Sequence, residues 1–395
     1  MSSPVQPRGT VLFPPYRNSY AMTDKPTPEE ILADPQRDLS LKPATANHSP
    51  DASYATSNRK WQGIPGIERT TNGRLFATWY SGGEGEGPDN FVLLVQSDDD
   101  GKTWSGPTSV IDPPGKVRAY DPCLWIDPQG RLWLFWAQSF MWWDGRSGTW
   151  AIRCDEPDAS KLEWTEPRRV CDGIMMNKPT VTRAGDWLLP TAVWTCTKVH
   201  DPAMVDQEFS NVTINRDSGE TFAHLGSADI PERGFDEHMV VEKNNGDLWM
   251  LVRRKDGVGE SLSTDNGKTW SPGALAPIAG PDSRFFIRRL ASGNLLLINH
   301  IDFKDAKNKR TNLTALLSTD DGQTWQGGLL LDGRESVSYP DATQAPDGSI
   351  YAIHDHSRHG EMQILMSVFT EEDILAGKLV SKQSRLAVMV DQKSD

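Results

Sequence analysis

Charged, amide and imidazole side chains occur at comparable places along the chain, each a few residues ahead of a glycine-containing turn. Arg and Lys bind carboxylates and other anions, while Glu, Asp and His transfer protons. One or two such residues in each unit of a repeat is what a single shared pocket needs. The candidates of this kind are Arg118, Asp121, Asn177, Lys178, Glu237, His238, Arg284 and Asp341.

A glycine motif shows that the chain is a repeat. A polar residue, a glycine and one further residue precede an apolar run, as in N-G-R-L-F-A-T-W at Gly73 and N-G-D-L-W-M-L-V at Gly246. The motif occurs six times, at intervals of 47 to 61 residues, which predicts six units.

A second motif, S/N-x-D-x-G-x-x-W/F, occurs four times. Its aspartate can accept backbone N–H bonds within a turn, and its aromatic residue can pack beneath the hairpin. We therefore assign a structural role to Asp99, Asp217, Asp265 and Asp320.

These units predict an all-β, six-bladed β-propeller. The apolar runs are short, rich in β-branched and aromatic residues and broken by Asn-Gly and Asp-Gly turns, as in β-hairpins, and the period suits four-stranded radial blades. A helical turn is expected only at 371–376. The propeller should span 59–395, after a Pro- and Ser-rich N-terminal arm at 1–58. Because the sixth unit lacks the aspartate motif, we expect a strand from the N-terminal side to complete it.

Composition excludes several classes of function. The formal charge of −13 argues against a general nucleic-acid or anionic-membrane binder, and no apolar run is long enough to span a membrane. The 4 cysteines lack metal-type spacing, and nothing in the sequence calls for a metal or cofactor. The absence of a visible secretory signal indicates the cytoplasm by default. The sequence makes no prediction of oligomeric state.

The two motifs resemble the Asp-box, or BNR, repeats of the sialidase superfamily, from residue 59 to the end of the chain. This resemblance implies a sialidase-type propeller and a carbohydrate substrate. Sialidases remove terminal sialic acids with a tyrosine nucleophile, a glutamate that activates it, an aspartate acid/base and three arginines on the substrate carboxylate. A phenol suits an anionic sugar because a carboxylate nucleophile would be repelled by it.

The resemblance implies roles for individual residues. Glu237, which begins E-H-M-V-V-E, is similar to the activating glutamate, and Tyr339 in V-S-Y-P-D is similar to the nucleophile. Arg253 resembles the second arginine, with Arg254 as a register alternative, and Arg310 resembles the third.

The acid and the first arginine match less well. Asp89 stands where the family has its acid/base, although Glu84 and Glu86 share the same loop. Gly63, in G-I-P-G-I-E, takes the place of the first arginine, so either another cation replaces it or the substrate is a different acidic sugar. The cations available in the sequence are Arg69, Arg118, Lys178, Arg284 and Arg288.

Each assignment has a structural alternative. Buried arginine–carboxylate pairs also hold blades together. Tyr339 is also compatible with a core position, although its spacing to Arg310 favours a functional role. His238 is compatible with a pocket wall or a general base. The Trp142–Trp143 pair fits an aromatic wall for a sugar or ordinary packing between blades. We interpret the histidines of H-D-H-S-R-H at 354–359 as surface residues rather than metal ligands.

Three functions are consistent with these residues. The first is an exo-acting glycoside hydrolase that removes a terminal acidic sugar. The second is a lyase that cleaves uronate glycosides by β-elimination, with Tyr339 or His238 as the base. The third is a glycan-binding propeller without catalysis.

Overall fold

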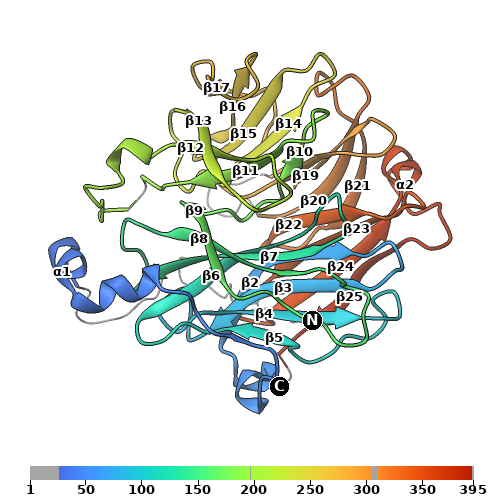
Figure 1. The fold of residues 1–395 in the computed structure, drawn as a ribbon. Coiled ribbons are helices and arrows are strands. Elements are labelled where there is room, and N and C mark those ends of the chain that lie inside the picture. Colours follow the sequence, from blue (N-terminus) through green and yellow to red (C-terminus); the bar gives the residue numbers. More distant parts are fainter. Residues whose placement is uncertain (1–25, 196, 304–309, 394–395) are drawn as a thin grey trace, which may run out of the picture.

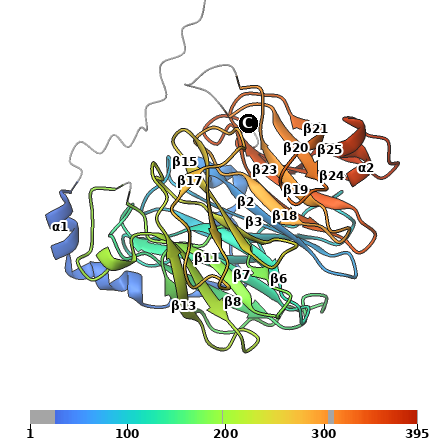
Figure 2. The same cartoon turned by 90° about the horizontal axis from the view of Figure 1, so that it is seen from above.

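The computed structural model describes residues 26–195, 197–303 and 310–393. Six antiparallel sheets are arranged around one axis, so the prediction of an all-β, six-bladed β-propeller is confirmed (Figures 1 and 2). The strands of each blade are given from the axis outward. The first blade contains β2 (Trp61–Arg69), β3 (Leu75–Gly82), β4 (Phe91–Ser97) and β5 (Ser109–Ile111), and the second contains β6 (Val117–Ile126), β7 (Leu132–Phe140), β8 (Gly148–Cys154) and β9 (Arg168–Asp172). The third blade contains β10 (Thr180–Val181), β11 (Trp187–Ala192), β12 (Ser210–Asn215) and β13 (Ala223–Ala228), and the fourth contains β14 (Met239–Glu242), β15 (Leu248–Arg254), β16 (Gly257–Ser263) and β17 (Ala274–Leu275). The fifth blade contains β18 (Phe286–Arg289), β19 (Leu295–His300), β20 (Leu313–Ser318) and β21 (Gln326–Asp332), and the sixth contains β22 (Val337–Gln344), β23 (Ile350–His356), β24 (Gln363–Phe369) and β25 (Arg385–Asp391).

The six glycines of the first motif lie in the turn between the first and second strand of each blade. Their φ angles fall between 81° and 105°, a region that side chains strongly disfavour. The turns set the hairpin register, which brings the first strand of each blade to the axis.

The four aspartate-motif turns join the third and fourth strands of their blades. In the first, Asp99 accepts the backbone N–H of Thr103 at 2.9 Å and its hydroxyl at 2.7 Å. These hydrogen bonds lower the pKa of Asp99 to about 2. The motif glycine also packs against the neighbouring blade: a Cβ on Gly219 would lie 2.5 Å from the Trp133 ring, and one on Gly322 would lie 2.5 Å from Trp249.

The first and last blades meet without exchanging strands. Strand β25 supplies the outer strand of the sixth blade, whereas β1 (Ala46–Asn47) pairs with β5 and adds a fifth strand to the first. The expectation of an N-terminal strand in the sixth blade is therefore wrong, because the chain after 376 supplies the strand itself. Asp391 in β25 instead accepts hydrogen bonds from the first-blade side, from Thr56 (2.7 Å), Arg59 (2.9 Å) and Gln62 (2.8 Å).

Helices are short and peripheral. They are α1 (Pro28–Ala33) and α2 (Glu371–Ala376), with 3-10 turns η1 (Pro35–Leu41), η2 (Ala52–Tyr54), η3 (Thr56–Asn58) and η4 (Val205–Gln207). Helix α2 confirms the helical turn expected at 371–376. Within the described ranges, none of these helices has the length and apolar character needed to cross a bilayer.

Candidate active site

The first strands of several blades are kinked near the axis. Ile64, Asp121 and Tyr339 each precede a proline and have φ angles of 61°, 48° and 54°. In each strand the register shifts at this point, as in a β-bulge. Bulges of this kind re-aim side chains, and backbone strain of this type is concentrated at functional sites. Glu237, just before β14, also has a positive φ, of 45°.

Tyr339 and Glu237 meet at the axis although 102 positions separate them in the sequence. The Tyr339 hydroxyl donates to Glu237 Oε1 at 2.8 Å. Arg253 Nη1 donates to the same carboxylate oxygen at 2.7 Å and to the Tyr339 hydroxyl at 3.1 Å. Burial and the Glu237 charge raise the pKa of Tyr339 to about 12, while Arg253 and two other arginines act in the opposite direction.

Arg253 is the guanidinium that faces this group. Its Nε also donates to Asp282 at 2.6 Å. Arg254, the register alternative, instead donates to Asp256 from Nε at 2.7 Å and from Nη2 at 2.8 Å. Because alternate residues of a strand point to opposite faces, only one of the pair can reach the axis.

Two further guanidiniums lie over the Tyr339 ring. The Cζ atom of Arg310 is 5.3 Å from the ring centroid and that of Arg358 is 4.4 Å away. The sequence indicated Arg310 but not Arg358, which is in the turn between β23 and β24. Arg358 is the arginine of the H-D-H-S-R-H run, which the sequence analysis considered only for its histidines. We call Tyr339, Glu237, Arg253, Arg310 and Arg358 the tyrosine cluster.

Asp89 does not point toward the tyrosine cluster. It is exposed, packs on Gly83 and contributes to raising the pKa of Asp112, which is raised mainly by burial. Glu86 of the same loop is closer, with Oε1 3.8 Å from Arg358 Nη1. The resemblance indicated this loop, and within it Glu86 rather than Asp89 is the carboxylate that lies near Arg358.

Asp121 is a buried carboxyl beside the tyrosine cluster. Burial first, and then the charge of Glu86, raise the pKa of Asp121 to about 8, although the Arg118 guanidinium acts against them. Asp121 therefore holds a proton at neutral pH. Arg118 itself lies 3.7 Å above the Tyr120 ring and donates to Asn90 at 3.3 Å.

Three of the expected ligand-binding residues form a separate buried group. Lys178 contacts Glu68 at 2.9 Å and Asp341 at 3.1 Å, and it also donates to two backbone carbonyls of the first and second blades. Arg284 Nη2 lies 3.6 Å from Asp341. We call Lys178, Glu68, Asp341 and Arg284 the axial ion-pair cluster. Its contacts join five blades, which supports a structural role for Lys178. Asp341 Oδ1 and Arg284 Nε and Nη1 are buried and have no hydrogen-bond partner among the described residues.

His238 and Asn177 support the backbone around Glu237. Asn177 Nδ2 donates to the carbonyls of Glu237 (2.9 Å) and His238 (3.0 Å). His238 Nε2 donates to the Asn211 carbonyl at 2.7 Å, and burial lowers the His238 pKa to about 4. This bond holds the imidazole against the backbone of β12, and burial makes His238 a weaker base than a free histidine.

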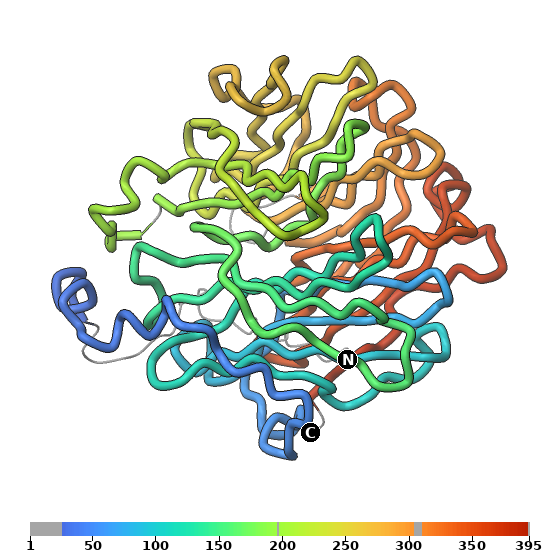
Figure 3. Tube along the Cα trace, viewed as in Figure 1, coloured from blue at the N-terminus to red at the C-terminus, as the bar shows by residue number. Residues whose placement is uncertain are grey.

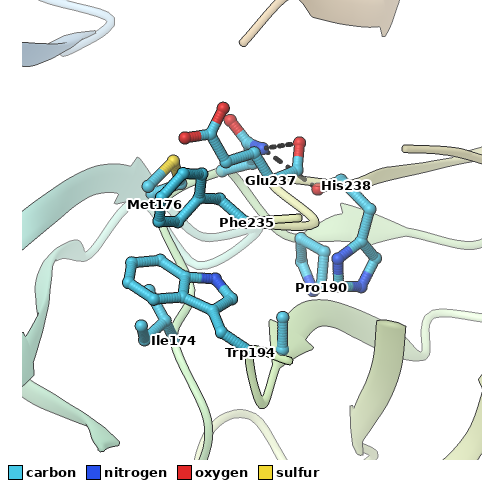
Figure 4. Close-up of a pocket in the computed structure, with 9 residues that line it drawn as sticks. Ile174, Met176, Pro190, Trp194, Phe235, Glu237 and His238 are labelled. Carbon is cyan, nitrogen blue, oxygen red and sulfur yellow. Dashed lines mark hydrogen bonds between the residues drawn. The ribbon is translucent and has the colours of Figure 1, made fainter. Parts of the chain in front are cut away.

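Aromatic side chains form one wall beside Glu237. The rings of Trp194 and Phe235 meet edge to face at 5.1 Å, and Trp143 stacks on Trp194 at 5.1 Å. Trp142 is half-buried, with its ring 6.4 Å from that of Phe235. Trp194 and Phe235 also line a cavity of about 10 Å³ that reaches Glu237, on the scale of one water molecule (Figure 4).

His354 and His356 of the H-D-H-S-R-H run are buried, so the expectation that these histidines lie on the surface is wrong for these two, whereas His359 is exposed. His354 Nε2 lies 3.1 Å from Asp332, and His356 Nδ1 lies 3.1 Å from Gln363. Among the residues that the structure describes, no group of three or more His, Cys, Asp or Glu side chains has the geometry of a metal site.

Residues 73–352 match the family described as BNR repeat-like domain, so the chain belongs to that family. Among solved structures, the Hadza microbial sialidase Hz136 superposes with a TM-score of 0.63 at 19% identity, over 84% of this chain and 69% of that one. The leech intramolecular trans-sialidase gives 0.61 at 13%, over 85% and 71%. A protein of unknown function from Dyadobacter fermentans gives 0.58 at 17%, over 76% and 92%. No curated protein matches the sequence. The resemblance to the sialidase superfamily is thus confirmed at the level of the fold.

Proposed function

We propose that this protein is an exo-acting glycoside hydrolase that removes a terminal acidic sugar, a sialic acid or a related acid, from a glycan. The hydrogen bond of 2.8 Å between the Tyr339 hydroxyl and Glu237 supports this function most strongly. A buried tyrosine whose pKa lies near 12 is a poor nucleophile unless a base removes its proton, and Glu237 is positioned to do so.

The first half-reaction forms a bond from Tyr339 Oη to the anomeric carbon. The phenolic proton passes to Glu237, and the glycosidic C–O bond breaks with its electron pair going to the leaving oxygen. Arg253 contacts both Oη and the carboxylate of Glu237, so it stabilises charge on either side of this transfer. Arg310 is available for the sugar carboxylate by a two-pronged hydrogen bond.

A proton must reach the leaving oxygen. We assign this role to the Glu86–Asp121 pair rather than to Asp89, because Asp121 retains a proton at neutral pH and Glu86 contributes to that retention. Glu86 is the more exposed of the two and is therefore better placed to meet a leaving group. In the second half-reaction the same pair takes a proton from a water molecule, whose oxygen bonds to the anomeric carbon. The bond from that carbon to Tyr339 Oη breaks with its electron pair going to Oη, and Glu237 returns the phenolic proton.

The test compares two tyrosines of the sixth blade on an aryl sialoside and on aryl glycosides of uronic acids. Tyr339→Phe should lower kcat by at least about a thousandfold, because a nucleophile acts as a unit with its base. Tyr351→Phe is the matched control, since the Tyr351 hydroxyl bonds to Asp100 at 2.6 Å, away from the cluster. The control should retain activity.

Three results would contradict the proposal. A fully active Tyr339→Phe enzyme would remove the nucleophile. Wild-type protein that yields an unsaturated uronate, detected by ultraviolet absorbance, would instead be a lyase. Glycan binding without any product would make the propeller a binding protein.

A further inference from the structure

Gly63 in β2 and Arg358 in the turn between β23 and β24 share one space. A Cβ atom on Gly63 would lie 2.6 Å from Arg358 Cδ and 2.9 Å from both Cγ and Nε. Contacts this short do not occur between real Cβ atoms and their neighbours, so the arginine stem can lie there only because residue 63 has no side chain. The place where the sequence lacks its expected guanidinium is filled from the other side of the first–sixth blade interface.

The interface makes this substitution possible. The sixth and first blades lie side by side, in red and blue in Figure 3, and β2 packs along β22 and β23. Asp355, fully buried in β23, accepts the backbone N–H of Ile64 at 2.8 Å and the Nε of Arg358 at 3.0 Å. One carboxylate therefore fixes Arg358 relative to the strand that contains Gly63.

The Arg358 guanidinium is held by hydrogen bonds through Nε and Nη2, while Nη1 remains available to a ligand. Its Nη2 donates to Ser338 Oγ at 2.8 Å, and the Ser338 hydroxyl in turn donates to Asp355 at 2.6 Å. Its Nη1 lies 3.8 Å from Glu86, beyond hydrogen-bond reach. An incoming carboxylate can therefore take Nη1 without displacing a hydrogen bond to Glu86.

We propose that Arg358 is a substrate-binding residue that completes a three-arginine carboxylate site with Arg253 and Arg310. The three guanidiniums come from the fourth, fifth and sixth blades and surround Tyr339. This proposal rests on the proposed function, because it takes the ligand to be an acidic sugar. It also assigns a purpose to Gly63: its lack of a side chain makes room for Arg358.

The experiment measures preference for a carboxylate, by titration calorimetry, with N-acetylneuraminic acid, D-glucuronic acid and D-galacturonic acid, each against its methyl ester. Wild-type protein should bind at least one acid more than about tenfold better than the ester, because the ester loses the charge that arginine recognises. Arg358→Ala should lose most of that preference. Arg334→Ala should keep it, since Arg334 pairs with Asp332 at 2.7 Å in an exposed loop between the fifth and sixth blades.

Two further variants protect the test against misfolding, because Arg358→Ala leaves buried Asp355 without its cation. Arg358→Lys keeps that charge but loses the planar fork, so it should weaken acid binding while leaving thermal unfolding nearly unchanged. Gly63→Arg combined with Arg358→Ala returns a guanidinium to the shared space from the first blade, and it should recover part of the preference.

The outcomes separate the two proposals. Full preference in Arg358→Ala, or in Arg358→Lys if the alanine variant does not fold, would overturn the role of Arg358 alone. A wild-type protein without preference for any of the three acids would overturn both proposals. Preference that depends on Arg358, with no turnover of aryl glycosides, would sustain the arginine site and overturn the hydrolase.

Discussion

The tyrosine cluster and the axial ion-pair cluster both combine buried carboxylates with cationic side chains, yet the residue at the centre of each has different partners. In the axial cluster, the Lys178 ammonium contacts two carboxylates and two carbonyls. In the tyrosine cluster, Glu237 Oε2 is buried and has no hydrogen-bond partner among the described residues. The axial cluster also has buried atoms without a hydrogen-bond partner among the described residues, Asp341 Oδ1 and Arg284 Nε and Nη1, so an unpaired atom alone does not distinguish the two clusters. The tyrosine cluster differs because its unpaired oxygen belongs to a carboxylate that is hydrogen-bonded to a tyrosine hydroxyl.

The partners of the central residue therefore distinguish the two clusters, although charged side chains form both. A lysine saturated by the protein has nothing left to offer a substrate, although Asp341 and Glu68 raise its pKa against the effect of burial. The carboxylate of Glu237 has one oxygen without a hydrogen-bond partner among the described residues and lies beside a tyrosine hydroxyl and an arginine. It can therefore accept the proton of that hydroxyl. Substitutions in the two clusters should therefore fail in different ways.

The largest stability effect should come from the axial cluster. Lys178→Met would leave Glu68 and Asp341 buried without their cation, and breaking a buried pair from one side costs about 3–5 kcal/mol. Urea unfolding measures this loss. Lys161→Met, which removes an exposed lysine paired with Glu163, should leave the midpoint unchanged. If Lys178→Met were as stable as wild type, the axial cluster would have no structural role.

Charges of both clusters, Glu237 and Arg284, act on the pKa of Asp121. Substitution of Asp121 should therefore produce the second effect on stability. Its folded pKa of about 8 exceeds the unfolded value of about 3.9, so the folded state keeps a proton that the unfolded state loses. Stability from this group therefore falls as pH rises from about 4 to 8, by at most about 1.4 kcal/mol per pH unit. Asp121→Asn removes this penalty, so its stability relative to wild type should increase from pH 5 to pH 8. A difference that stays constant with pH would contradict the raised pKa.

Arg310→Ala should affect binding far more than folding. Arg310 is only half-buried, and its Nη2 contact with the Asp282 carbonyl is long, at 3.3 Å. Its loss should weaken an acidic ligand by about 2 kcal/mol or more, because the ligand charge loses a partner, with little change in the urea midpoint. Calorimetry and unfolding on the same preparation measure the two quantities. Equal affinity in the variant would place Arg310 in structure.

The sequence predicts the fold more completely than it predicts the contacts within the tyrosine cluster and the axial ion-pair cluster. Turn chemistry is local, so Gly73 and its five counterparts, with φ angles of 81–105°, revealed six blades. Tyr339 and Glu237 came from a family motif, and no local rule brings them within 2.8 Å. Contacts across blades were harder to predict: the Arg358 stem occupies the space beside Gly63 of another blade, and Lys178 pairs with carboxylates more than 100 positions away. The partners of a charge depend on how blades close around the axis, which motif spacing does not specify.

The smallest effect lies outside both clusters, at the N-terminus of α2. The Thr370 hydroxyl accepts the backbone N–H of Asp373 at 3.3 Å, and Asp373 accepts the Thr370 N–H at 2.8 Å, which forms a capping box. Thr370→Ala should cost about 1 kcal/mol of stability. Because α2 is peripheral, the change should leave acid preference and turnover at wild-type levels. If this remote substitution altered acid binding as much as Arg310→Ala, the binding losses expected for the tyrosine cluster would reflect general loosening of the propeller rather than loss of a ligand contact.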